Sequence, residues 1–474
     1  MSVNLTPAEA AIYRDAMLRA CLLAAGLLAA TQGAARAADL TDVASSFDEG
    51  NRFDFRFRVR YDHLEKRAQI KRESEGPGQD TIAIFKDLTY ESHRDQLALR
   101  AEFGLYHDLM LHAELPIILE EASSYSLDQS AGSGCVFDGP GTPNCVNDKN
   151  STTLHDMIVP TGGYDAANRG VGLSGSQVFR SVTRGARGGS GGDAFDTLNL
   201  GLTWGPLSQA RDDTKPTWTI LVEGQFSIGN IKAFDRASPD RNHGVSEGTH
   251  NLFIQTALSK RFRWFEPYWS AWYLLPIARG DSLYVDYGRA QKQKNPMQRG
   301  GTSFGTEIVP LDRAERQYKL AIDVRGRIEG HFGGRGYSEA WELLAGAPVL
   351  ACNDAQAQYN PACGSSAPAN PYNMKPAFTG VTTIENYATL GVDLGLQAQL
   401  GPFIRFRTGF IYSHDQSHLI TGDDIGSPMN GTGRVTQASE FNPAYRPIID
   451  QVGRRYLVDN VNLYDFYLWA QVMF

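Results

Sequence analysis

The chain contains 474 residues, of which 48 are glycine and 11% are aromatic, and its formal net charge is −8. This mild acidity argues against nucleic-acid binding. The sequence has no run of 18 apolar residues and its mean hydropathy is −0.33, which argues against a helical membrane protein. A membrane barrel is still compatible with these values, because barrel strands are half polar and barrel loops are hydrated.

The N-terminal region has the layout of a secretory signal peptide. Arg19 precedes an apolar run over residues 20–30, and small residues follow as far as the Ala-Arg-Ala sequence at 35–37. The apolar run is too short to span a membrane, and an A-x-A sequence at its end is typical of a cleavage site.

We therefore expect cleavage before Ala38. Residues 1–37 are then the signal peptide, and residues 1–16 within them are an extension or a misassigned start. Residues 38–49 are expected to form a periplasmic N-terminal segment. Cleavage removes three arginines and two acidic residues, so the mature charge becomes −9.

Residues 52–61, with the sequence RFDFRFRVRY, alternate strictly between charged and apolar side chains. A period of two predicts a β-strand with one apolar face and one charged face. In a membrane barrel the apolar face would contact lipid and the arginines would face the lumen. The reverse orientation would cost roughly 2–4 kcal/mol for each arginine near the membrane midplane.

The same alternation recurs along the chain and predicts twelve strands. Their expected ranges are 50–63, 84–105, 109–119, 194–205, 216–228, 248–262, 266–278, 314–330, 338–349, 384–400, 403–416 and 454–474. The connections between them alternate in length, as short periplasmic turns and long extracellular loops do in outer-membrane barrels. The long connections cover roughly 64–82, 120–193, 229–248, 279–313, 350–383 and 417–453.

The mature chain has four cysteines in two close pairs, Cys135 with Cys145 and Cys352 with Cys363. Even pairing in an exported chain implies two local disulfides, and both would lie in long outer loops. Neither pair has the spacing of a metal site. We expect neither a metal nor a cofactor.

The last eleven residues, YDFYLWAQVMF, form an alternating segment that ends on Phe474. This segment resembles the C-terminal signature of Gram-negative bacterial outer-membrane β-barrel proteins, which are porin-like in their strand and loop rhythm. The resemblance implies an all-β fold over residues 50–474, a closed antiparallel transmembrane β-barrel in the outer membrane. It also implies contact with membrane lipids and lipopolysaccharide, and recognition of the final strand by the assembly machinery. Tryptophans that flank two of the short turns fit an aromatic girdle; they are Trp204, Trp218, Trp264 and Trp269.

The inward faces of the predicted strands carry many charged residues. The candidate pore-lining residues are Arg52, Arg56, Arg58, Arg60, Arg325, Arg327, Arg405, Arg407, Glu102, Glu114 and Asp323. The first and last strands are neighbours in a closed barrel, so several of the arginines are expected on one wall. Guanidinium groups bind carboxylate and phosphate, and charged lumen residues set pore selectivity.

These features predict a passive channel for hydrophilic, anionic solutes or oligosaccharides, with no catalytic residues. The arginines resemble the tracks of 12-stranded porins for acidic oligosaccharides. A plugged lumen, in which the charges satisfy one another, is the structural alternative. An exopolysaccharide export barrel is a further functional alternative.

A lipid-modifying hydrolase, of the phospholipase or lipid A deacylase type, is the enzymatic alternative. Residues 412–418, with the sequence YSHDQSH, contain Ser413, His414, Ser417 and His418. Acyl hydrolysis needs a nucleophile and a base within hydrogen-bond reach. Adjacent residues of a strand point to opposite faces, which disfavours Ser413 and His414 as that pair.

Overall fold

The computed structural model describes residues 38–47, 53–75, 82–128, 146, 151–156, 158, 182–188, 193–233, 243–284, 286, 288–313, 316–350, 378–429, 431–442 and 444–474. The expected signal peptide, residues 1–37, and the candidate pore-lining residue Arg52 lie outside the described residues. Both therefore stay predictions.

All four cysteines of the expected disulfides also lie outside the described residues. They are Cys135, Cys145, Cys352 and Cys363. The pairing of Cys135 with Cys145, and that of Cys352 with Cys363, is consequently not supported by the described structure and stays a prediction from the sequence alone.

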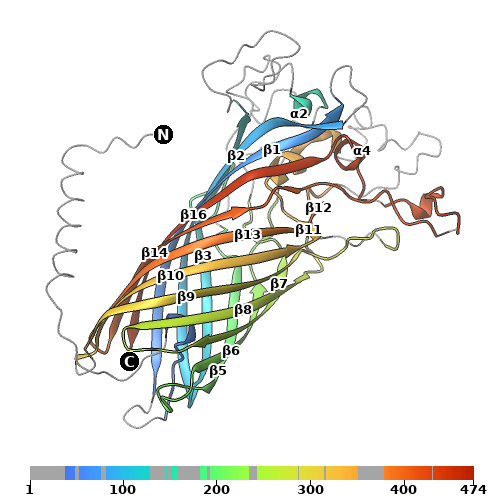
Figure 1. The fold of residues 1–474 in the computed structure, drawn as a ribbon. Helices are drawn as coiled ribbons and strands as arrows, with labels where there is room; N and C mark the ends of the chain where they lie inside the picture. Colours follow the sequence, from blue (N-terminus) through green and yellow to red (C-terminus); the bar gives the residue numbers. More distant parts are fainter. Residues whose placement is uncertain are drawn as a thin grey trace, which may run out of the picture.

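Twelve long strands of the described chain form one closed antiparallel barrel (Figure 1). Each strand pairs with the next around the sheet, and the first also pairs with the last, which closes the barrel. The strands are β1 (Phe55–Glu75), β2 (Ile82–Tyr106), β3 (Leu109–Leu127), β5 (Thr197–Leu207), β6 (Thr217–Ser227), β7 (Thr249–Ser259), β8 (Phe265–Ala278), β9 (Gln298–Arg313), β10 (Tyr318–Phe332), β13 (Tyr387–Leu400), β14 (Ile404–Asp415) and β16 (Tyr456–Met473). The predicted all-β barrel of about twelve strands is confirmed.

The outer surface of the barrel is an apolar belt. On β13, the side chains of Leu390, Val392, Leu394 and Leu396 are 45–53% exposed, whereas Asp393 between them is 3% exposed. The same alternation occurs on β1, where Phe57 is exposed and Arg56 is buried. A closed barrel with a continuous apolar exterior satisfies its backbone hydrogen bonds internally and presents hydrocarbon to lipid. The chain is an integral outer-membrane β-barrel.

The hairpin of β1 and β2 extends well beyond this belt. β1 has 21 residues and β2 has 25, although about 9–11 residues are enough to cross a membrane. The outward face of β1 changes from apolar to polar after Tyr61, with His63, Glu65 and Arg67 following. Residues 64–82, which the sequence suggested as a long loop, are therefore largely continued strand.

One predicted loop and one predicted strand are wrong, and the two errors compensate in the strand count. Residues 298–313, expected within a loop, form β9. Residues 338–349, expected as a strand, instead contain α3 (Trp341–Gly346), and the short helix η6 (Pro348–Leu350) follows it. The chain between the predicted strands 314–330 and 338–349, which would have been a short periplasmic turn, is consequently part of a long outer connection.

The outer end of the barrel has a hydrophobic core of its own. Ile70 of β1, Leu88 of β2 and Leu127 of β3 pack in one cluster with Leu343 and Leu344 of α3. Figure 1 shows α2 (Thr152–His155) and α4 (Pro447–Asp450) at this end, opposite the C-terminus. No helix among the described residues is long and apolar enough to cross a membrane.

Four short strands complete the described sheets. β4 (Val182–Arg184) pairs with β3, and β15 (His418–Leu419) pairs with β16. β11 (Gly334–Gly336) and β12 (Thr382–Ile384) pair with each other.

Candidate functional site in the barrel lumen

Residues 38–47, called here the N-terminal segment, lie inside the periplasmic end of the barrel. The helical turn η1 (Asp39–Thr41) contacts β7 through a hydrogen bond of 2.7 Å between the hydroxyls of Thr41 and Ser259. On the other side of the lumen, Ser46 donates a hydrogen bond of 2.6 Å to the carbonyl of Gly104 in β2. A Cβ at position 104 would lie 2.7 Å from the Ser46 oxygen, so glycine permits this close approach.

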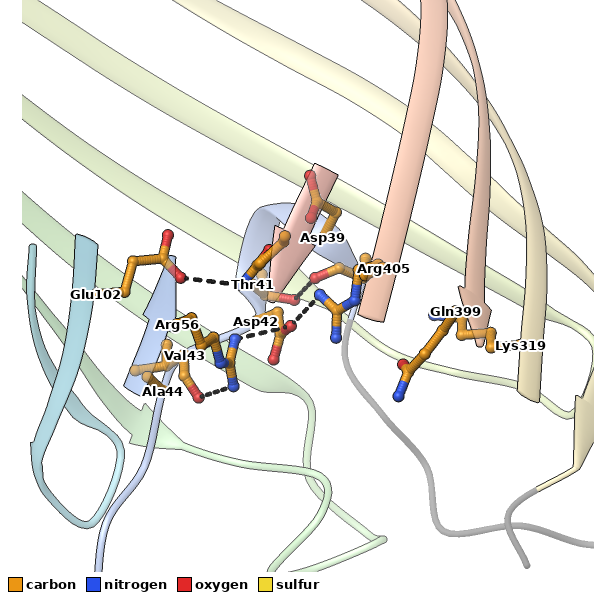
Figure 2. Close-up of polar contacts among 12 residues, drawn as sticks. Asp39, Thr41, Asp42, Val43, Ala44, Arg56, Glu102, Lys319, Gln399 and Arg405 are labelled. Carbon is orange, nitrogen blue, oxygen red and sulfur yellow. Dashed lines mark hydrogen bonds and ion pairs between the residues drawn. The ribbon is translucent and has the colours of Figure 1, made fainter. Parts of the chain in front are cut away.

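Asp42 of the N-terminal segment bridges two lumen arginines (Figure 2). Its Oδ2 lies 3.1 Å from Arg56 of β1 and 2.6 Å from Arg405 of β14. Arg56 also forms a 2.9 Å ion pair with Asp54. Because both arginine side chains are at most 10% exposed, a carboxylate between them offsets much of the cost of burying their charges.

Asp39 lies between two further arginines of the same wall. Its carboxylate oxygens are 3.8 Å from Arg58 and 3.6 Å from Arg407. Burial acts to raise the pKa of Asp39, but Arg58, Arg407 and Arg405 together hold that pKa below its ordinary value. The group is therefore an anion at neutral pH.

The arginines of β1 and β14 together form what we call the arginine strip. Its members are Arg56, Arg58, Arg60, Arg405 and Arg407. Strand acids also contact it: Arg407 pairs with Asp323 of β10 at 2.6 Å, and Arg60 pairs with Asp62 at 2.5 Å. The strip is thus largely neutralised, partly by the sheet and partly by the N-terminal segment.

Ten of the eleven predicted pore-lining residues are described, and all ten lie at inward-facing positions of the barrel. Glu102 and Glu114 both pair with Arg100, at 2.7 Å and 3.3 Å. Arg325 pairs with Asp323 at 3.2 Å. The guanidinium of Arg327 forms neither a hydrogen bond nor an ion pair with another described side chain, and it lines the lumen cavities.

Polar cavities lie along the lumen of the described part of the barrel. The central one, of about 540 Å³, reaches the N-terminal segment at Asp39 and is lined by Arg58, Arg60, Arg327 and Arg407. A second, of about 470 Å³, shares Arg58 and Arg60 with it, and a third, of about 440 Å³ towards the outer end, shares Arg327. The space inside the barrel is therefore wide enough for small polar solutes and is bordered by arginine.

The acidic residues of the N-terminal segment are the main feature that sequence reasoning missed. Asp39 and Asp42 lie in a stretch that was expected in the periplasm and that has no strand periodicity. One signal was available in the sequence, because the first strand has more arginines than acidic residues. Buried arginines need carboxylate partners, so some of these had to come from elsewhere in the chain.

The residues of the hydrolase alternative are separated in the structure. His414 is exposed and lies 3.3 Å from the Asn462 side-chain oxygen, whereas Ser413 lines the outer lumen cavity. The His418 ring stacks on Tyr387 with a centroid distance of 3.7 Å. No serine hydroxyl in the described part of the chain is hydrogen-bonded to either imidazole.

Comparisons with known structures show distant likenesses to membrane barrels. No family model and no curated protein matches the chain. An outer-membrane channel from Pseudomonas putida F1 is 9% identical with a TM-score of 0.35, over 94% of this chain and 100% of that one. The outer-membrane protease OmpT from Escherichia coli is 6% identical with a TM-score of 0.27, over 90% of this chain and 99% of that one. A Pseudomonas aeruginosa FadL homologue is 8% identical with a TM-score of 0.27, over 89% and 90%.

Likenesses this distant carry no argument about function, and they include both channels and a protease. The function therefore has to be argued from the lumen itself.

Proposed function

We propose that the protein is an outer-membrane channel for hydrophilic, anionic solutes. The observation that carries this proposal is the placement of Asp42, whose carboxylate sits between Arg56 and Arg405. A carboxylate of the chain thus occupies the position that a solute carboxylate or phosphate would take on the arginine strip. Guanidinium groups suit both anions, because their donors match paired oxygen acceptors.

The central cavity supports the same proposal. Arg327 forms no direct ion pair with a described side chain, although its charge acts on Glu329 and Asp465, and it lines both the central and the outer cavity. A cation that is exposed to lumen water raises the local concentration of anions and favours their passage. An anion in the outer cavity would pass Arg327 and then reach Arg60, Arg58 and the N-terminal segment.

The test is single-channel recording of the mature protein in planar bilayers under a salt gradient. We expect an anion-selective reversal potential. Replacing both Arg60 and Arg327 with glutamine should lower the anion-to-cation permeability ratio severalfold, because both line the central cavity. The matched control is Arg67→Gln, which removes an arginine from the outer surface of β1 and should leave the ratio unchanged.

A correctly folded barrel that conducts no ions would contradict the proposal. So would a permeability ratio that responds equally to the lumen variant and to the surface control. No specific observation favours the hydrolase or the polysaccharide exporter, so neither is proposed.

A further inference from the structure

A buried acidic pocket lies at the periplasmic end of the lumen, beside the start of the N-terminal segment. Glu266 of β8 and Glu307 of β9 face each other across adjacent strands. Ser259 and Lys319 complete the pocket, and the four residues are between 0% and 6% exposed.

The charges of this pocket do not balance. Glu307 accepts a hydrogen bond from the Lys319 ammonium at 3.2 Å and another from the Asp39 amide at 2.8 Å. The other carboxylate, Glu266, faces no cation of its own: the charged groups that act on it are Lys319, already bound by Glu307, and Glu307 itself. Two buried carboxylates thus share one ammonium, and an unpaired buried charge is costly.

Glu266 also has an unused acceptor. Its Oε1 accepts hydrogen bonds from the Ala38 nitrogen at 2.5 Å and from the Ser259 hydroxyl at 2.8 Å. Its Oε2 is buried and has no hydrogen-bond partner. A peptide nitrogen at Ala38 carries one N–H and no charge, so it can supply neither the second hydrogen bond nor the missing cation.

We propose that Glu266, with Ser259 and Glu307, forms a binding site for the α-ammonium group that signal-peptide removal creates at Ala38. Hydrolysis of the peptide bond between residues 37 and 38 by a signal peptidase consumes one water. It leaves a carboxylate on residue 37 and an amine on Ala38, and the amine takes up a proton. The resulting ammonium has three donors and one positive charge, which is what the pocket lacks.

This site would fix the register of the whole N-terminal segment. Asp39 follows Ala38 directly, and Asp42 lies three residues further on, so an anchored Ala38 places both carboxylates against the arginine strip. Removal of the signal peptide would then be the step that seats the N-terminal segment in the periplasmic end of the lumen. The inference is independent of the transported solute, because it concerns only the chain's own N-terminus.

The first experiment is intact-mass measurement of protein purified from outer membranes, followed by amine labelling at neutral pH. The mass should correspond to a chain that begins at Ala38. In the folded barrel, the α-amine should react with an N-hydroxysuccinimide ester at least about tenfold more slowly than in denaturant, because labelling requires the buried pair to open. Mass spectrometry of the N-terminal peptide separates this signal from lysine labelling.

Two variants test the site directly. Glu266→Gln keeps the shape but removes the charge, and insertion of one glycine between Ala37 and Ala38 moves the ammonium out of register by about 3.4 Å. In both folded variants, the α-amine should react almost as fast as it does in denaturant. The control Glu65→Gln, on the outer surface, should leave the slow labelling of the folded protein unchanged. Heat-modifiable migration in gel electrophoresis verifies folding of each variant.

A mature chain that starts elsewhere would overturn the proposal. Equal labelling of the folded and denatured wild type would also overturn it, and this comparison needs no variant. These outcomes leave the channel proposal standing, since that proposal is tested by ion selectivity.

Discussion

Asp39 and Asp42 lie three residues apart in the chain and together contact four arginines of the arginine strip. Acids such as Asp323 and Glu102 belong to strands, so the sheet fixes their positions. The N-terminal segment belongs to no strand of the barrel, and it is held by ion pairs and by hydrogen bonds to strand residues. Its two carboxylates are therefore the partners of the strip that can leave without unfolding the barrel.

The first prediction concerns the pH at which the N-terminal segment is held. The folded pKa of Asp39 lies below its ordinary value of 3.8, so its ion pairs stabilise the seated segment above that pH. The contribution is lost as the pH falls through the folded pKa. Conductance of the wild type should therefore rise as the pH is lowered below the ordinary pKa of 3.8 and through the lower folded pKa.

The control for this prediction is Asp39→Asn, which cannot form the ion pairs at any pH. It should conduct more than wild type at the higher pH and change less on acidification. Identical pH profiles of the two proteins would show that Asp39 does not hold the segment.

Strands whose polar and apolar residues alternate regularly were predictable from the sequence. The two elements that were predicted wrongly, β9 and α3, differ for physical reasons. β9 was not predicted because Gly301 and Gly305, on its lumen-facing side, interrupt the alternation of its sequence. A Cβ at Gly305 would lie 2.5 Å from the Tyr268 hydroxyl of β8, and a Cβ at Gly301 would lie 2.8 Å from the Trp272 ring. Aromatic rings of the neighbouring strand fill the space above these glycines. The periodicity of one strand cannot reveal such packing between two strands.

α3 was mistaken for a strand because its sequence is short and mostly apolar. Such a run fits a buried strand or a buried helix equally well by periodicity. All six residues of α3 are buried, four of them in the WELL sequence at 341–344. The helix is stabilised by packing against the outer core of β1, β2 and β3. These strands are far from α3 in the sequence, so its local pattern could not show this packing.

The lumen-facing arginines were also predictable, because alternation alone assigns them to one face of β1 and β14. Their acidic partners in the N-terminal segment were not, since a segment without periodicity gives no face or register. The same reason hid the pocket at Glu266, whose members come from β7, β8, β9 and β10.

The second prediction uses two positions on the outward face of β13. Leu394 lies in the middle of the apolar belt and Leu400 lies at the periplasmic end of the same strand, and both are more than half exposed. Leu394→Arg should lower the free energy of unfolding in lipid vesicles by roughly 2–4 kcal/mol, whereas Leu400→Arg should cost about 0–1 kcal/mol. Urea titrations of the reconstituted variants measure both values.

Equal costs at the two positions would mean that Leu394 does not lie near the midplane of the membrane. The placement of the belt relative to the bilayer would then be wrong, even though the strand pairing would stand.

At the scale of the whole molecule, the lumen is a set of polar cavities between two ends that are built differently. The outer end carries a hydrophobic core that joins strands and loops. The periplasmic end is filled by a polar segment that is held through ion pairs and hydrogen bonds. Ionic contacts respond directly to pH and to competing anions, whereas a core of apolar side chains has no charge to titrate or to displace. Regulation of passage is therefore expected at the periplasmic end.

The last prediction follows from removing that segment. A variant that lacks residues 38–47 behind an intact signal peptide should still fold, because each barrel strand keeps its own ladder of backbone hydrogen bonds. Its conductance should rise severalfold. Its anion selectivity should rise as well, since Asp39 and Asp42 are lost while Arg56, Arg405 and Arg407 remain. Single-channel recording under a salt gradient measures both quantities, with heat-modifiable migration as the folding control. An unchanged conductance would mean that the segment does not obstruct the path. A larger conductance with a shift toward cations would mean that the strip, once released from Asp39 and Asp42, does not set the selectivity.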